Sequence, residues 1–177
     1  QGRIKGSLDI PLSIMGADQV ERTVEELASH DFDAIYSSPC QSALQTAKML
    51  ASHRTVRVKR VQKFKNLDHG LWHGMLIDEV KQRQPKVYRQ CQDNPEMVCP
   101  PEGESVAVAQ RRVRTVLARI VKKHRVGTIA LVIPEPLASL VRGELQDHEF
   151  GDFWRAEQDC GGWTVIDVES GREPVIG

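Results

Sequence analysis

The stretch Thr128-Ile129-Ala130-Leu131-Val132-Ile133 is the longest apolar run of the chain, bounded by Gly127 and Pro134. A short apolar run between two such residues is typical of a β-strand that is buried on both faces of a sheet. Residues 104–124, before the run, carry apolar side chains at helical spacing, and residues 136–145, after it, begin with a proline, as helices often do. The sequence therefore predicts a strand between two helices.

The same alternation runs through the first part of the chain. Apolar spacing predicts a helix within residues 16–30, and Asp33-Ala34-Ile35-Tyr36-Ser37 predicts a short strand. A second helix has an apolar face made by Ala43, Leu44, Ala47, Leu50 and Ala51. Residues 55–61 then predict another strand. This pattern favours an α/β fold, a three-layer αβα sandwich around a mostly parallel sheet, with residues 1–177 as a single domain.

Two parts of the chain depart from simple alternation. Residues 70–101 hold short helical stretches, 76–82 and 86–92, broken by prolines, which predicts an insertion lying over the pocket at one end of the sheet. Residues 163–168 and 173–176 are joined by Ser-Gly, and we expect them to form a hairpin-like edge.

The composition of the 177 residues is that of a globular domain, with 40% apolar side chains. Its 24 lysines and arginines balance 24 aspartates and glutamates, which argues against nucleic-acid and membrane partners. The longest apolar run is far shorter than the roughly 20 residues that span a bilayer, so we expect a soluble protein. The sparse cysteines favour reduced thiols in a cytoplasmic protein, without a structural metal. They are Cys40, Cys91, Cys99 and Cys160.

Ligands of such sheets bind beyond the carboxyl ends of the strands, so the segments that follow strands are informative. Four segments carry motifs, in this order: Gly2-Arg3-Ile4-Lys5-Gly6-Ser7-Leu8-Asp9-Ile10-Pro11-Leu12-Ser13 with Gly16; Ile35-Tyr36-Ser37-Ser38-Pro39 with Gln45-Thr46-Ala47; Asp68-x-Gly70-x-Trp72-x-Gly74; and Pro101-Glu102-Gly103-Glu104-Ser105. Over nearly the whole chain they resemble the motifs of the histidine phosphatase superfamily, the phosphoglycerate-mutase-like proteins.

The resemblance implies a specific chemistry. A histidine in an Arg-His-Gly tripeptide attacks a phosphoryl group, an arginine binds its oxygens, a glutamate protonates the leaving oxygen, and a second histidine follows the buried strand. The tripeptide would precede Gln1. At the arginine position this chain has Ser42, and at the glutamate position it has Asn66. At the second histidine it has Pro134, followed by Glu135.

Each departure removes a chemical function. Ser42 cannot offer the bidentate, charged fork of a guanidinium. Asn66 has no proton to donate at a useful pKa, and general acid catalysis contributes about 10²–10⁴ in rate. Pro134 has no titratable group, and the Glu135 carboxylate is expected to repel a phosphate. We therefore expect a catalytically dead or strongly impaired domain with a binding or structural role and with no catalytic residues.

Two alternatives stay open. The chain could be a divergent phosphatase or phosphomutase for a small phosphorylated metabolite, with groups such as Lys5 or His69 recruited to the pocket, or a sensor that binds a phospho-ligand without turnover. The expected ligand-binding residues are Arg3, Lys5, Gly6 and His69. The expected partner is a small phosphorylated ligand or another protein, and the sequence does not fix an oligomeric state.

A rival constellation is the pair His69-x-x-x-His73 beside Asp68. Two histidines at this spacing bind zinc on a helix, but Gly70 and Gly74 favour a loop, so we expect neither a metal nor another cofactor. Cys40, just after a predicted strand, is expected to be a buried structural thiol.

The resemblance also implies a missing strand. In the family, the strand that leads into Arg-His-Gly lies inside the sheet. Without it, neighbouring strands would present unpaired backbone groups, at about 1–3 kcal/mol for each. We therefore expect this strand to lie outside residues 1–177, or another segment to fill its place.

Overall fold

The computed structural model describes residues 2–97, 99–148, 154–155 and 161–168. Its sheet has three parallel strands in the order β2-β1-β3. These are β1 (Ala34–Ser37), β2 (Val58–Arg60) and β3 (Ile129–Val132). Ser37 is paired with both Arg60 and Val132, so the three strands end together at one carboxyl edge. The predicted parallel α/β sheet is confirmed.

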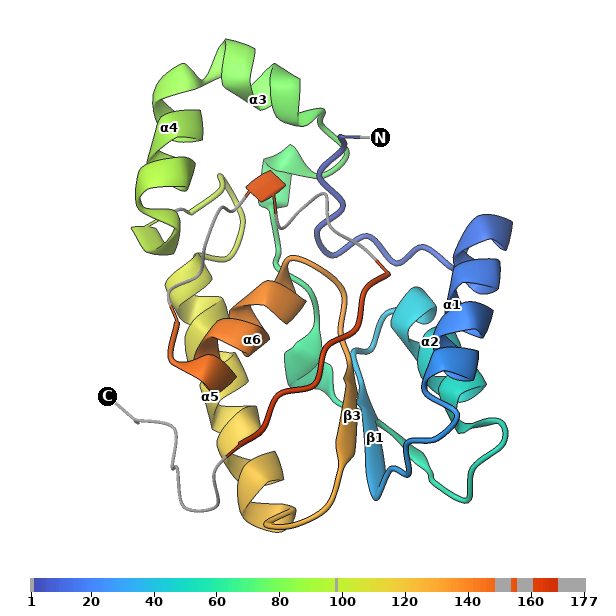
Figure 1. Cartoon of the computed structure of the whole chain (residues 1–177). Helices are drawn as coiled ribbons and strands as arrows, with labels where there is room; N and C mark the ends of the chain where they lie inside the picture. Colours follow the sequence, from blue (N-terminus) through green and yellow to red (C-terminus); the bar gives the residue numbers. More distant parts are fainter. Residues whose placement is uncertain (1, 98, 149–153, 156–160, 169–177) are drawn as a thin grey trace.

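Helices cover both faces of this sheet (Figure 1). On one side lie α1 (Ile14–Glu26) and α2 (Gln41–Ala51), and on the other lie α5 (Val106–Lys123) and α6 (Leu137–Gln146). This arrangement confirms the three-layer sandwich. Each helix was predicted within a few residues, because its apolar residues recur at helical spacing.

Each face of the sheet has its own core. Ala34 and Tyr36 of β1 pack with α5 and α6, whereas Ile35 packs with Leu27, Ala47 and Leu50 on the other face. Successive strand residues point to opposite faces, so one short strand supplies both cores. Because both cores share β1, the carboxyl edge is fixed relative to both helical layers.

Helix α5 anchors the segment that carries the third motif. The hydroxyl of Ser105 caps the helix by accepting a bond from Val108 N, at 3.3 Å. One turn further on, Arg112 forms an ion pair with Glu104 at 2.8 Å, with both side chains nearly buried. The same guanidinium donates to the carbonyl oxygens of Lys63 and Asn66. This cation therefore fastens the backbone at Asn66 to α5.

The segment between the third and fourth motifs contains α3 (Ile77–Arg83) and α4 (Pro85–Asp93). In Figure 1 they lie at the end of the molecule toward which β1 and β3 run. Trp154 stacks on Tyr88 of α4, with 5.1 Å between ring centroids, and Trp72 lies 6.0 Å from Trp154. Whether residues 70–101 are an insertion over a pocket stays a prediction.

Two predictions about strands need correction. Residues 163–168 form no strand, since the segment is mostly exposed and meets α1 through a side chain, Trp163 Nε1 donating to Glu26 Oε2 at 2.7 Å. β3 is half-buried, not buried on both faces. Its edge away from β1 pairs with no strand within the described ranges. The expected strand before Gln1 stays a prediction, and residues 173–176 lie outside the described part of the chain.

No helix that the structure describes is both long enough and apolar enough to cross a membrane. The cytoplasmic location inferred from the cysteines stays a prediction.

Replacing Leu117 with alanine tests the core beneath α5. Leu117 is 2% exposed, and removing its buried methyl groups should lower the free energy of unfolding by about 2–5 kcal/mol in urea titrations. Val108→Ala, on the exposed face of the same helix, should change it by less than about 0.5 kcal/mol. Equal losses for the two variants would contradict this packing.

The thiol of Cys91 on α4 gives a second test. Burial raises the pKa of Cys91 from 9.0 to about 12, so roughly one molecule in 10⁴ carries the thiolate at pH 8. Iodoacetamide at pH 8 should modify exposed Cys99 and spare Cys91 until denaturant is added, as peptide mass spectrometry would show. Because the folded-state pKa is raised, this thiol's contribution to stability is present below pH 9 and lost as the pH rises toward 12. Labelling of Cys91 at the rate of Cys99 would contradict its burial.

Candidate functional site

An open cavity of about 3070 Å³ runs along β3 to the carboxyl edge of the sheet. At that edge it is lined by residues from four separate segments. They are Lys5, Cys40, Ser42, Asn66, Glu135 and Arg142. Lys5 thus lines the same cavity as Ser42, Asn66 and Pro134, the three positions at which the resemblance implies catalytic residues.

Asn66 joins three of these segments. Its Nδ2 donates to the carbonyl oxygens of Gly6, at 2.8 Å, and Glu135, at 2.9 Å, while its Oδ1 accepts from Leu137 N at 3.3 Å. The side chain is nearly buried, so each bond replaces a bond to water. At the position where the resemblance implies a proton donor, this chain has an amide that connects the loops of the site.

The loop that carries Lys5 is held by its neighbours. Ile4 exchanges backbone bonds with Met75 and Gly74, both at 2.9 Å. Gly6 has a φ of +48°, and a Cβ there would lie 2.8 Å from His69 Cδ2. A side chain at position 6 would therefore be strained and crowded, which explains the glycine.

The predicted ligand-binding residues Arg3 and His69 occupy different environments. Arg3 lines the cavity and donates to Gly74 O at 2.7 Å. His69 is 1% exposed and is not among the residues that line the cavity. The expectation that His69 forms part of the pocket wall is corrected, because its ring packs beneath Gly6 and beside His73.

The Ser7, His73 and Asp68 side chains resemble a catalytic triad only superficially. His73 Nε2 lies 3.2 Å from Ser7 Oγ and 3.8 Å from Asp68 Oδ1, and it also accepts from the backbone N–H groups of Ser7 and His69. A relay needs the serine and the carboxylate on different ring nitrogens, so this cluster cannot perform one. Within the described ranges, no three His, Cys, Asp or Glu side chains are grouped as a metal site requires.

Cys40 lies in the turn after β1, and Ser42 lies in the first turn of α2. Cys40 is half-buried, with its Sγ 3.6 Å from Ser38 Oγ and 3.7 Å from Ser42 Oγ. The start of α2 is capped from the first motif, because Asp9 Oδ1 accepts from Gln41 N at 2.6 Å.

The turn after β3 corrects the expectation for Glu135. Its Oε2 accepts from Ser139 N at 2.8 Å, and its Oε1 lies 2.8 Å from Arg142 Nη2. The carboxylate is largely buried against these partners. Its charge is compensated by the start of α6 and by a guanidinium, so the repulsion predicted for a phosphate is largely removed.

Cations dominate the cavity wall. The described residues that line it include nine lysines and arginines and four aspartates and glutamates. Arg60 and Lys65 reach this wall near the carboxyl edge, since Arg60 ends β2 and Lys65 precedes Asn66. Arg60 lies near the end of the predicted strand 55–61 and Lys65 follows it, so the positions of both could have identified them, but neither was among the predicted ligand-binding residues. Arg142 had no comparable signal, because it lies within a helix.

Comparison with known proteins agrees with this geometry. The model of the histidine phosphatase superfamily, branch 1, matches residues 1–176. The chain belongs to this superfamily. It is 30% identical over 175 residues to phosphoserine phosphatase 1 of Hydrogenobacter thermophilus, covering 99% of this chain and 83% of that relative.

More distant members of the superfamily share the fold. The adenosylcobalamin/α-ribazole phosphatase of Escherichia coli is 23% identical over 94% of this chain and 82% of its own length. The crystal structure of a putative α-ribazole-5′-P phosphatase from Escherichia coli superposes with a TM-score of 0.78 at 20% identity, covering 99% of this chain and 91% of that one. A mycobacterial glucosyl-3-phosphoglycerate phosphatase gives 0.76 at 21% identity, with 87% and 76% covered.

These relatives overturn the expectation of a catalytically dead domain. Two relatives that match 94% or more of this chain are named as phosphatases, phosphoserine phosphatase 1 and the adenosylcobalamin/α-ribazole phosphatase, and the match to the first reaches 30% identity. The expectation rested on the substitutions at Ser42, Asn66 and Pro134, each considered alone. The structure shows that Asn66 and Glu135 are engaged in bonds that organise the site.

Two substitutions test the role of Asn66. Asn66→Ala removes three bonds to backbone groups, and Asn66→Asp places a carboxylate against two carbonyl oxygens. Both should lower the free energy of unfolding, by about 1–3 kcal/mol for alanine and by at least as much for aspartate, in urea titrations. Asn94→Ala, at the exposed end of α4, should cost less than about 0.5 kcal/mol. An Asn66→Asp variant as stable as the parent would contradict the assigned bonds.

Proposed function

We propose that this chain is a divergent phosphatase that hydrolyses a small phosphorylated metabolite, releasing an alcohol and inorganic phosphate. The observation that carries this proposal is the end-to-end match to a superfamily member named as a phosphatase, together with Lys5, Arg60, Lys65 and Arg142 in the cavity wall near the carboxyl edge of the sheet. The expected partner of the chain is accordingly a small phosphorylated molecule.

The charges at the carboxyl edge support binding of an anion. Lys5, Arg60 and Lys65 contribute positive charge to the wall. The two acidic residues at this edge are already engaged, Asp9 with the start of α2 and Glu135 with Arg142 and Ser139 N. An excess of cations in a concave site raises the local concentration of a phosphorylated ligand.

The residue at position 66 determines which leaving groups the reaction should favour. The resemblance places the nucleophilic histidine before Gln1, so the residues of this site bind and orient the phosphoryl group. The Asn66 amide cannot protonate the leaving oxygen. The reaction should therefore favour substrates whose leaving group departs without a proton, and aryl phosphates should be hydrolysed faster than alkyl phosphates.

The names of the relatives suggest which substrates to try first. Phosphoserine, α-ribazole phosphate and glucosyl-3-phosphoglycerate are the substrates in those names. We propose to compare them with p-nitrophenyl phosphate as an aryl reference.

Lysine 5 provides the test of the site. Release of inorganic phosphate by the full-length protein should be measured across this panel. Lys5→Gln should raise KM about 5- to 10-fold, because it removes a cation from the wall. Lys63→Gln, two residues before Lys65 but outside the cavity lining, should leave KM unchanged.

Two results would count against this function. Absence of phosphate release from every substrate, by protein that unfolds cooperatively, would overturn it. Binding of inorganic phosphate without any turnover would favour the phospho-ligand sensor instead.

A further inference from the structure

Among the cations of the cavity wall, Arg142 is held by a compact set of bonds. Its Nη2 donates to Ser139 Oγ at 2.6 Å and lies 2.8 Å from Glu135 Oε1. Glu135 Oε2 in turn accepts from Ser139 N at 2.8 Å. The Glu135 and Arg142 side chains and the hydroxyl and backbone N–H of Ser139 form a closed network across the first turns of α6.

This network is tied to the rest of the site. The carbonyl oxygen of Glu135 accepts from Asn66 Nδ2, and the same amide nitrogen donates to Gly6 O beside Lys5. Ser38 N donates to Val132 O at 2.9 Å, so the turns after β1 and β3 begin side by side. These turns lead into α2, which carries Ser42, and into α6, which carries Arg142, and both residues line the cavity.

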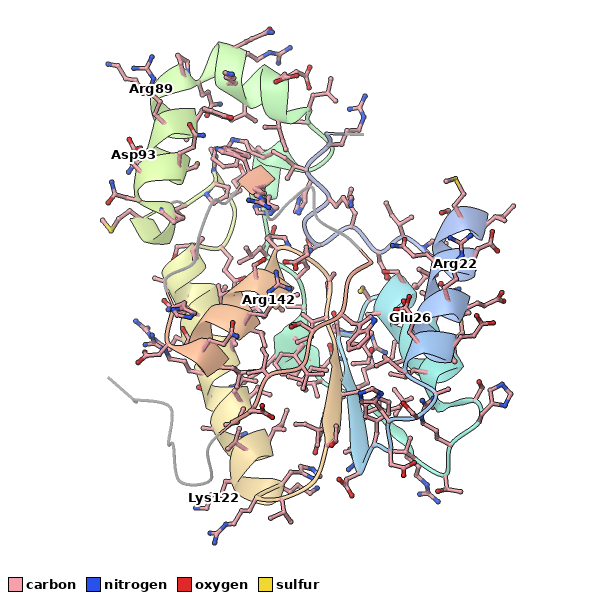
Figure 2. The ribbon with its side chains drawn as sticks, viewed as in Figure 1. Arg22, Glu26, Arg89, Asp93, Lys122 and Arg142 are labelled. Carbon is pink, nitrogen blue, oxygen red and sulfur yellow. The ribbon has the colours of Figure 1, made fainter. Side chains whose placement is uncertain are left out.

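Two nitrogen atoms of the Arg142 guanidinium, Nε and Nη1, are available to bind a ligand. Both of its contacts use Nη2, and neither Nε nor Nη1 donates to an acceptor in the described part of the chain. The side chain is 38% exposed and lines the cavity. Figure 2 shows Arg142 near the middle of the molecule, whereas Arg89 lies at its periphery. A planar fork fixed on one nitrogen and open at two others suits a phosphate oxygen pair.

We propose that Arg142 supplies the guanidinium that binds the phosphoryl group, in place of the arginine absent at Ser42, and that Glu135 is its positioning residue. The inference rests on the proposed function for its ligand class. Glu135 offsets part of the positive charge of Arg142, and Lys5, Arg60 and Lys65 supply the remaining attraction. The serine at position 42 and the glutamate at position 135 are then linked, because Glu135 positions the arginine that replaces the one absent at position 42.

Binding of inorganic phosphate, measured by calorimetry on the full-length protein, tests this inference without turnover. Arg142→Gln should weaken binding roughly 10- to 100-fold, the value of a charge-assisted bond pair. Arg142→Lys keeps the charge but loses the fork, and should weaken binding by at least 5-fold. The matched control is Arg114→Gln, which removes a similarly exposed arginine paired with Glu144 of α6 outside the cavity lining. It should change the dissociation constant by less than 2-fold.

A double substitution separates positioning from simple structural support. In the parent, Glu135→Gln should weaken phosphate binding about 3-fold, because Arg142 loses its anchor. In the Arg142→Gln background the same change should strengthen binding, because it removes a negative charge that no guanidinium then offsets. A purely structural role for Glu135 would give the same sign in both backgrounds.

The possible outcomes are distinct. Parent-like phosphate binding by Arg142→Gln and Arg142→Lys, with unchanged melting temperatures, would overturn the inference, as would absence of phosphate binding by the parent. Binding that depends on Arg142 in a protein without hydrolytic activity would support the inference and overturn the phosphatase proposal. Hydrolysis by the parent with no effect of Arg142→Gln on binding would overturn the inference alone.

Discussion

The side-chain amide of Asn66 is the interaction on which the candidate site depends. It bonds to backbone groups of the N-terminal loop and of the turn after β3, and its own backbone oxygen is bound by Arg112 of α5. A neutral amide offers two donors and an acceptor in one plane, and all of these are used here. A carboxylate at this position would offer no donor when ionised. The residue at the position where the resemblance implies a proton donor thus bonds to two other segments of the candidate site.

Much of the architecture could be read from the sequence, because periodicity reports burial directly. The stripe of apolar residues from Val106 to Ile120 defined α5, and the apolar run around Ala130 defined β3. Residues 163–168 have the composition of a strand, but a strand also needs a partner with free backbone groups. Pairing is a property of the whole fold, and the local pattern could not reveal that these residues would meet α1 through Trp163.

The sequence predicted which residues lie near the cavity, but it did not predict the contacts that these residues make. The turns after the strands were identified correctly, and Lys5, Ser42, Asn66 and Pro134 do meet at one cavity. What each residue does depends on partners that are distant in the sequence. Asp9 caps a helix that begins 32 residues later, and Arg142 offsets a carboxylate seven residues earlier, across a turn. Considered one at a time, these residues predicted only lost functions, whereas the structure shows that Asn66 and Glu135 are bonded to each other and to neighbouring segments.

The N-terminal loop is bonded to the rest of the protein at Ile4 and at Asp9, and this affects the entropy of ligand binding. Ile4 is bonded to the segment after the third motif, and Asp9 is bonded to α2, so only a short tether lies between two fixed points. The conformational entropy of that tether is lost when the chain folds and not when a ligand arrives. Association at this loop should carry a small entropic penalty from the backbone of Lys5. Loosening either fixed point would weaken affinity without altering any atom that touches the ligand.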